Sequence, residues 1–570
     1  MVEPRRMNPL YTIEGEALSK EVWQVYPRPQ MKRDSFYSLN GIWDFGCGKE
    51  KAYTEMIRVP FAPESPLSLI GRGHKKGDSL FYRRRFTLPD GFLKGRILLH
   101  IGACDQVCAV TVNGKKIGTH EGGYHPFCFD VTDEIRLENE IEITVKDDLS
   151  THEFPYGKQT DKRGGMWYTP VSGIWQTVWM EAVPEIYIRK LSIQTGADYA
   201  EITAEGGTGT GEVILHGEKE ISFPLNNGKA KISISNPVLW SPENPHLYDF
   251  TVVSGEDRVE SYFALRTLET KEVSGIKRMC LNGKPYFFHG VLDQGYYPDG
   301  LFTPAAPENY EKDILLLKSL GFNTLRKHIK CEPEWFYYLC DKMGMCVFQD
   351  MINNGDYNFL RDTAVPTLGF KRKNDVRAHR DEKTRKRFIE CMEETVQRLK
   401  NHPSIVYWTI FNEGWGQFDS QMMYEKLKNL DDSRFIATVS GWFKGADTDV
   451  DAQHVYFKPV KIKPGNKPVL VSEFGGYAYQ EKSHVFNPDK EFGYKKFASR
   501  KELSDGICHL YQNEIIPAIK QGLCGSIYTQ LSDVEDEING LVTYDRRVLK
   551  VLPEEFLPVS KAIYDEIGKV

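Results

Sequence analysis

The sequence predicts three domains in series: a β-sandwich over residues 1–184, a small immunoglobulin-like sandwich over 185–271, and a (β/α)8 barrel over 272–570. Three observations support this prediction. The chain has 570 residues, enough for three or four domains. Up to Lys271, short segments alternate polar and apolar residues between turn signals, which is typical of sandwiches. From Glu272 on, short apolar strands alternate with helical segments, the pattern of βαβ units.

In the first sandwich, the clearest signal is a hairpin. Asn113-Gly114 separates two strand-like segments, and this pair tolerates the positive φ angles that a type I′ turn needs. Pro184 marks the end of the domain. The predicted strands are Leu98–His100, Val107–Val112, Lys115–His120, Ile141–Val145 and Gly173–Trp179.

The second sandwich continues the all-β pattern over a length that suits an immunoglobulin-like fold. Its predicted strands are Tyr187–Ile193, Glu212–Leu215, Lys231–Ile234 and Tyr248–Val253.

The last domain alternates strands and helices. Helices are predicted at Glu308–Leu320, Glu334–Met343 and Arg380–Asn401, where Pro307, Gly321, Gly344 and Pro403 supply start and stop signals. Counted from Tyr286, the strands fit one (β/α)8 barrel. They are Tyr286–Val291, Asn323–Arg326, Cys346–Gln349, Ile405–Phe411, Phe435–Val439, Gln453–Phe457, Val469–Val471 and Gly525–Thr529.

Composition excludes several classes of function. Hydrophobic residues make up 41% and charged residues 27%, so neither disorder nor collagen is expected. The net charge is −6, without long runs of one sign, so neither nucleic acid nor an acidic membrane is an expected partner. No apolar stretch approaches the ~18 residues that span a bilayer, and the start lacks the apolar core of a secretion signal, so a cytoplasmic location is expected. The eleven cysteines form no zinc-type pattern and are expected to be reduced.

Two glutamates stand directly after apolar barrel strands. Glu413 follows Ile405–Phe411, and Glu473 follows Val469–Val471. The active site of such a barrel lies at the carboxyl ends of its strands, so both carboxylates should lie at one mouth. Either glutamate alone is as readily an ordinary strand-end residue. A facing pair, however, is what cleavage of a glycosidic bond requires, since one group donates a proton while the other attacks or activates water.

Several motifs resemble glycoside hydrolase family 2. Asn412-Glu413 and Ser472-Glu473-Phe474-Gly475 are similar to its acid/base and nucleophile motifs. The resemblance covers nearly the whole chain and implies a jelly-roll β-sandwich, an immunoglobulin-like sandwich and a catalytic barrel. The other motifs that carry it are Leu39–Trp43, Ser172–Gln176, Leu281–Pro285, His289–Val291 and Gly321–His328.

The resemblance implies that Glu413 is the general acid/base and Glu473 the nucleophile, with net retention at the anomeric carbon. Retention predicts carboxyl groups ~5–5.5 Å apart. Arg326 is expected to hold the nucleophile ionised, although a structural ion pair is the alternative. Asn412 is expected at the sugar's 2-hydroxyl, and Tyr456 is expected to bond Glu473, with core packing as its alternative.

Further residues at strand ends are candidates for binding sugar hydroxyls, with structural roles as the alternative: Asp293, His328 and Asp350. Trp415 and Trp442 are candidates for an aromatic face on which a pyranose stacks, with simple burial as the alternative. No cofactor and no metal are expected.

The sugar is less well defined by the sequence. β-Glucuronidases of this family carry an Asn-x-Lys pair whose lysine recognises the sugar carboxylate, whereas the matching place here reads Glu537-Ile538-Asn539. The missing cation and the acidic Glu537 argue against a uronate and favour a neutral hexoside, galactoside first.

We therefore predict an exo-acting retaining β-glycoside hydrolase that works by double displacement and is most similar to β-galactosidases. The alternatives are another sugar (a β-mannoside, β-glucuronide or furanoside) or a catalytically silent carbohydrate-binding protein. A barrel enzyme of other chemistry would need a metal cluster or a phosphate loop, and the sequence has neither pattern. The predicted partner is a carbohydrate substrate, and homo-oligomer formation is left open.

Overall fold

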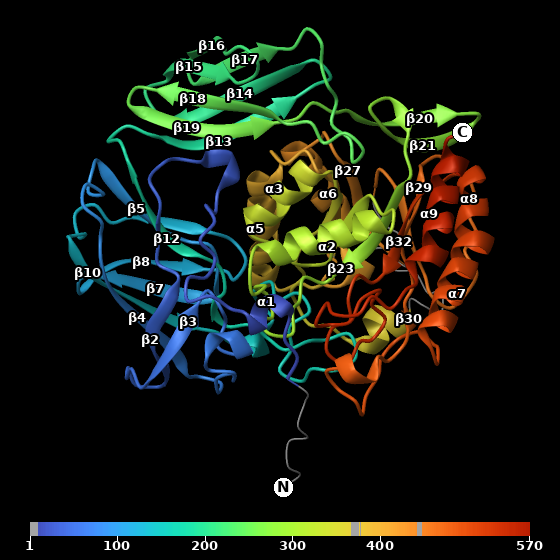
Figure 1. Cartoon of the computed structure of the whole chain (residues 1–570), viewed down its shortest axis with the longest axis horizontal. Helices are drawn as coiled ribbons and strands as arrows, with labels where there is room; N and C mark the ends of the chain where they lie inside the picture. The colour runs from blue at the N-terminus through green and yellow to red at the C-terminus, as the bar shows by residue number, and fades with distance from the viewer. Residues whose placement is uncertain (1–8, 366–374, 377, 442–446) are drawn as a thin grey trace.

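The computed structural model describes residues 9–365, 375–376, 378–441 and 447–570. Two β-sandwiches and a barrel make up the molecule, as the sequence predicted (Figure 1). No helix within the described ranges is long and apolar enough to cross a bilayer.

The first sandwich is built from two antiparallel sheets, β1-β12-β5-β9 and β3-β2-β4-β10-β7-β8, and a small pair, β11-β6. Alternate side chains of the strands point inward and form one apolar core. The strands are β1 (Tyr37–Ser38), β2 (Gly41–Gly48), β3 (Glu55–Val59), β4 (Ser79–Thr87), β5 (Arg96–Ile101), β6 (Cys104–Asp105), β7 (Val107–Val112), β8 (Lys115–Glu121), β9 (Phe127–Asp130), β10 (Glu138–Lys146), β11 (Gly173–Ile174) and β12 (Val178–Val183).

The hairpin between β7 and β8 has the predicted turn. Val112 pairs with Lys115, and both Asn113 (φ 49°) and Gly114 (φ 83°) adopt positive φ. The predicted strand Gly173–Trp179 is instead divided into β11 and the start of β12. It breaks at Trp175, whose ring packs against Phe302 of the barrel domain and whose Nε1 donates to Gly123 O.

The second sandwich is one antiparallel sheet of seven strands in the order β13-β14-β17-β16-β15-β18-β19. Alternate residues of these strands meet in a single core, so the sheet folds over on itself. The strands are β13 (Ile188–Thr195), β14 (Tyr199–Gly206), β15 (Thr210–Leu215), β16 (Ile221–Asn226), β17 (Lys229–Ser233), β18 (Tyr248–Ser254) and β19 (Asp257–Phe263). A small sheet leads into the barrel: β20 (Leu268–Val273), β21 (Ile276–Leu281) and β22 (Lys284–Pro285).

The barrel has eight parallel strands in the order β27-β26-β25-β24-β23-β32-β29-β28, and β27 also contacts β28. Every predicted barrel strand is present. The strands are β23 (Phe288–Asp293), β24 (Thr324–Lys327), β25 (Cys346–Asp350), β26 (Ile405–Phe411), β27 (Phe435–Val439), β28 (Asp451–Val455), β29 (Val469–Gly475) and β32 (Leu523–Thr529). A two-residue pair, β30 (Tyr477–Ala478) and β31 (Lys495–Lys496), lies in the loop after β29.

Helices connect most of the barrel strands and form the outer layer. They are α2 (Glu308–Ser319), α3 (Glu334–Met343), α5 (Glu382–Leu399), α6 (Ser420–Leu430), α7 (Arg500–Leu510), α8 (Ile516–Lys520) and α9 (Pro553–Ile567), and a short helix α1 (Ile13–Glu16) precedes the first sandwich. No helix separates β28 from β29, whose connecting residues are all described.

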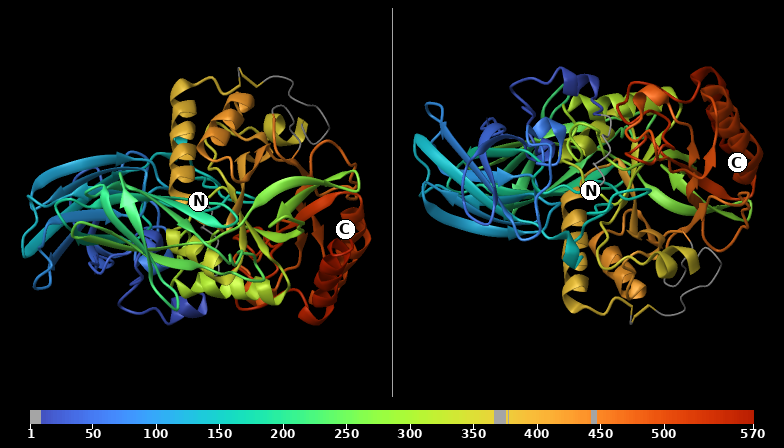
Figure 2. Two further views of the ribbon diagram at one scale, coloured as in Figure 1. Left: turned by 90° about the horizontal axis from the view of Figure 1, so that it is seen from above. Right: turned by 90° about the horizontal axis from the view of Figure 1, so that it is seen from below.

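The first sandwich lies directly beside the barrel (Figure 2). Helix α5 faces the first sandwich: His125 of the sandwich lies 2.8 Å from Thr395 Oγ1 and 3.3 Å from Glu394 Oε2 of that helix. The segment 156–169, between the sandwich strands β10 and β11, runs over the barrel loops: the backbone N–H of Tyr156 donates to Asn353 O at 3.0 Å. One mouth of the barrel is therefore bordered by the first sandwich.

Candidate active site

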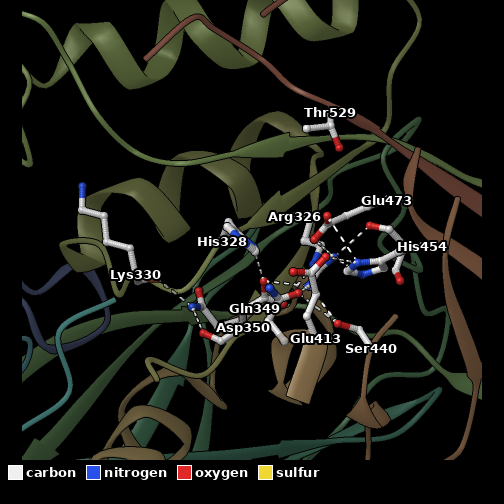
Figure 3. A network of polar contacts seen from close by, with 12 residues as sticks. Arg326, His328, Lys330, Gln349, Asp350, Glu413, Ser440, His454, Glu473 and Thr529 are labelled. Atoms are coloured by element: carbon white, nitrogen blue, oxygen red, sulfur yellow. Dashed lines mark hydrogen bonds and ion pairs between the residues drawn. The ribbon is translucent and has the colours of Figure 1, made fainter. Parts of the chain in front are cut away.

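Arg326 is the centre of a buried polar network at the carboxyl ends of the barrel strands (Figure 3). Its Nε donates to Asp350 Oδ1 at 3.0 Å, and its Nη1 donates to Glu473 Oε1 at 2.9 Å. Burial alone would lower the pKa of Arg326, but Asp350 and Glu473 outweigh it, so the pKa stays above its usual value. The guanidinium therefore remains charged and fixes one carboxylate on the adjacent strand β25 and another across the barrel mouth on β29.

Glu473 lies within β29 and is held by two donors. Arg326 binds Oε1, and the Tyr456 hydroxyl donates to Oε2 at 2.6 Å. Burial alone would raise the pKa of Glu473, but nearby His454 and Arg326 outweigh it and lower the pKa below its usual value. The structure thus holds this side chain as a carboxylate, the form that a nucleophile needs.

Glu413 follows β26 in a tight 3-10 turn, Asn412–Gly414. Its φ of 51° lies in the left-handed region, which costs a non-glycine residue about 1–2 kcal/mol. Its Oε1 lies 2.9 Å from His454 Nδ1, and the same nitrogen lies 3.4 Å from Glu473 Oε2. The ring of His454 therefore reaches both glutamates.

The two glutamates face each other closely. One oxygen of Glu413, one oxygen of Glu473 and one ring nitrogen of His454 all lie within 4.8 Å of one another. In the described part of the chain, these three form the one group of histidine, cysteine and acidic side chains close enough to hold a metal ion. A cation bound there would occupy both carboxylates.

Asn412 is oriented by the same network. Its Oδ1 accepts from Arg326 Nη2 at 2.9 Å and from Ser440 Oγ at 3.0 Å. Because its oxygen is engaged, its amide nitrogen is the group left to bind a ligand.

The other predicted polar residues form pairs around this centre. His328 Nδ1 lies 2.8 Å from Asp350 Oδ2. Burial lowers the pKa of His328 to about 4, although Asp350 acts to raise it, so the ring is neutral near pH 7. Asp293 accepts a hydrogen bond from Lys327 and another from the backbone N–H of Gly295. Asp350 thus contacts Arg326 directly, whereas Asp293 belongs to a neighbouring cluster with Lys327.

Of the two tryptophans predicted to stack on the sugar, the structure describes Trp415. Trp415 is 2% exposed, and its ring stacks on Trp167 of the first sandwich with centroids 5.4 Å apart. Its faces are therefore largely covered by protein. Trp442 lies outside the described residues.

Sequence reasoning missed His454, Ser440 and Lys158. His454 stands two residues before Tyr456, and residues at that spacing along a strand lie on the same face. That spacing was the available signal for His454. Lys158 belongs to the sandwich segment, so no barrel pattern pointed to it.

Comparisons with known proteins agree with this arrangement. Three family models match: "Glycosyl hydrolases family 2, TIM barrel domain" at residues 272–475, "Glycosyl hydrolase 2 galactose-binding domain-like" at 74–208, and "Glycosyl hydrolases family 2" at 190–266.

The chain is 25% identical to a β-galactosidase of Thermoanaerobacter pseudethanolicus and 28% identical to one of Leuconostoc mesenteroides, over 73% and 80% of its length. It spans only 58% and 45% of those two proteins. It is 26% identical to the β-glucuronidase of Felis catus, over 76% of this chain and 72% of that protein.

Among solved structures, a β-glucuronidase of an uncultured Clostridium species superposes with a TM-score of 0.72 at 19% identity, covering 96% of this chain and all of that one. This likeness shows that the two proteins share a fold. The three family matches, one for each domain of the chain, show that this protein belongs to glycoside hydrolase family 2.

Proposed function

We propose that the protein is an exo-acting retaining β-glycoside hydrolase. The observation that carries the proposal is the separation of the two carboxylates, whose nearest oxygens lie within 4.8 Å. Retaining enzymes keep their carboxyl groups ~5–5.5 Å apart, whereas inverting enzymes need ~6.5–9.5 Å to admit a water between them. The short separation favours direct attack by one carboxylate.

In the first step, an oxygen of Glu473 attacks the anomeric carbon and forms a glycosyl ester. The bond to the glycosidic oxygen breaks, and that oxygen takes the proton of Glu413 and leaves as an alcohol. In the second step, Glu413, now a carboxylate, takes a proton from water. The water oxygen bonds to the anomeric carbon, the ester to Glu473 breaks, and the sugar leaves with its original configuration.

The surrounding contacts support this division of roles. Glu473 accepts from Arg326 and Tyr456, which keep it ionised for attack and receive its charge again when the ester breaks. In the described network, only Oε1 of Glu413 has a hydrogen-bond partner, His454. The other oxygen, Oε2, is left to carry the transferred proton.

The sugar is the finer part of the proposal. The curated relatives carry the names of β-galactosidases and β-glucuronidases. The barrel residues 537–539 taken alone favour a neutral hexose, so a β-galactoside is the first substrate to test.

A panel of 4-nitrophenyl β-glycosides tests the proposal, with proton NMR of the first-formed anomer. The β-anomer should form first, and Glu413→Ala and Glu473→Ala should each lower turnover by orders of magnitude with unchanged thermal unfolding. Release of the α-anomer first would contradict retention. A folded wild-type protein that cleaves no β-glycoside but binds sugars would instead be a silent carbohydrate-binding protein.

A further inference from the structure

Lys158 is a buried lysine that the first sandwich places beside the candidate active site. Its side chain is 7% exposed. Its ammonium group lies 4.7 Å from the centre of the Trp415 ring, two residues beyond Glu413 in the chain. Burial lowers the pKa of Lys158 below its usual value. Glu537, Glu413 and Glu473 are close enough to oppose this shift, but burial is the larger effect. A cation from another domain therefore contributes to the electrostatics of the site.

The backbone around Lys158 is fixed against the barrel. Gly157 has φ 66°, and a Cβ there would lie 2.9 Å from Ile329 O, just beyond the end of β24. Only glycine fits this approach without displacement. On the other side, the backbone N–H of Tyr168 donates to Lys158 O at 3.0 Å. The position of the lysine is thus determined by the packing of both domains.

The ammonium group has no ionic partner in the described chain. Among the described residues, no carboxylate lies within ion-pair distance of Nζ, and no hydrogen bond to it occurs. Buried charges are ordinarily paired, because removing a charge from water is costly. The nitrogen is not fully enclosed by the described residues and keeps a small area in contact with solvent.

We propose that Lys158 is a glycone-binding residue whose ammonium group pairs with a carboxylate carried by the sugar, which makes the substrate a β-linked uronide. This inference rests on the proposed function and names the substrate class. A carboxylate is the ligand that best matches an unpaired buried cation, since a charge-assisted hydrogen bond is roughly twice as strong as a neutral one. The lysine supplies the cation that residues 537–539 lack.

Glu537 does not take Lys158 as an ion-pair partner. Its Oε2 accepts from the Tyr168 hydroxyl, and its Oε1 accepts from Asn539 Nδ2 at 2.9 Å. Burial raises the pKa of Glu537, which Lys158 partly opposes, so its carboxyl is more readily protonated than an exposed one. Its repulsion of an acidic sugar is reduced accordingly.

The test compares sugars that differ only at C6. The substrates are 4-nitrophenyl β-D-galacturonide against the β-D-galactoside, and the β-D-glucuronide against the β-D-glucoside. In one of these pairs the wild type should prefer the uronide. Lys158→Met should lower kcat/KM for that uronide by about 10- to 150-fold, the range for losing a hydrogen bond to a charged group. The neutral partner should change less than about threefold.

Two variants serve as controls. Lys158→Arg keeps the charge and should retain part of the uronide preference. Lys162→Met removes an exposed lysine from the same segment and should behave as the wild type. Preference for the neutral sugar in both pairs, or an equal effect of Lys158→Met on both sugars, would overturn the inference.

Calorimetry with free galacturonate and glucuronate separates this inference from the proposed hydrolysis. Binding to the wild type that is lost in Lys158→Met supports the role of the lysine even if no glycoside is cleaved. Cleavage of glycosides with unchanged uronate binding in Lys158→Met would leave the hydrolase standing and refute the role of Lys158.

Discussion

Tyr456→Phe is the smallest change that tests the proposed mechanism. It removes one oxygen atom, the hydroxyl that donates to Glu473 Oε2 at 2.6 Å and lies 2.8 Å from Thr529 Oγ1. The carboxylate loses charge when Glu473 attacks and regains it when the glycosyl ester breaks. The lost hydrogen bond should therefore slow the second step more than the first.

The size of the effect follows from the kind of hydrogen bond. A hydrogen bond to a charged group contributes about 1.5–3 kcal/mol, which corresponds to roughly 10- to 150-fold in rate as an upper range. We expect kcat to fall within that range and KM to fall with it, because the glycosyl-enzyme accumulates. The pKa of Glu473 should rise without this donor, so the acid limb of the pH profile should move to higher pH.

Stopped-flow measurement of nitrophenolate release is the assay, and a burst equal to the enzyme concentration is the expected signature. Tyr407→Phe is the matched control. Tyr407 is a barrel tyrosine on β26 whose hydroxyl has no hydrogen-bond partner among the described residues, so its loss should leave kcat unchanged. A Tyr456→Phe enzyme whose kcat lies within threefold of the wild type, with no burst and no shifted acid limb, would refute the reasoning.

Three further predictions concern the base, the domain contact and acid stability. In Glu413→Ala, azide should partly restore turnover of an activated aryl glycoside and yield a glycosyl azide, which chromatography detects; no azide product would argue against the assigned base. Gly157→Ala should lower the free energy of unfolding by about 2 kcal/mol or more, whereas Gly114→Ala, with φ 83° but open space, should lose only about 1 kcal/mol; equal losses in urea titrations would contradict the contact. Burial alone would raise the pKa of Glu181, but a histidine and two arginines hold it at about 2. Its stabilisation, about 3 kcal/mol, should be present above pH 4.5 and lost as the pH falls toward 2. Urea titrations should therefore show a smaller acid-dependent loss in Glu181→Gln than in the wild type.

Much of the fold was predictable from local patterns. The barrel strands are short apolar runs bounded by helix signals, and α3 has the predicted bounds Glu334–Met343. In the second sandwich, three strands were missed: β14, β16 and β19. In β14, buried Ala200 and Ile202 alternate with half-buried Glu201 and Thr203, so this strand did carry a period of two in its sequence.

The site was predictable where one strand supplies each group. Glu413 follows β26, while Glu473 and Arg326 lie near the carboxyl ends of β29 and β24, and the carboxyl ends of such strands meet. Lys158 was not predictable, because its place depends on how two domains dock. No pattern of local periodicity encodes a contact between residues as far apart in the chain as Gly157 and Ile329.

The docking of segment 156–169 also bears on how such proteins can be recombined. An excised barrel would leave the Trp415 ring without Trp167 and the Glu537 carboxyl without the Tyr168 hydroxyl. Exchanging the first sandwich between homologues would therefore change residues beside the candidate active site without changing the sequence of the barrel. The first sandwich and the barrel are separate in sequence, but the surroundings of the candidate site depend on both.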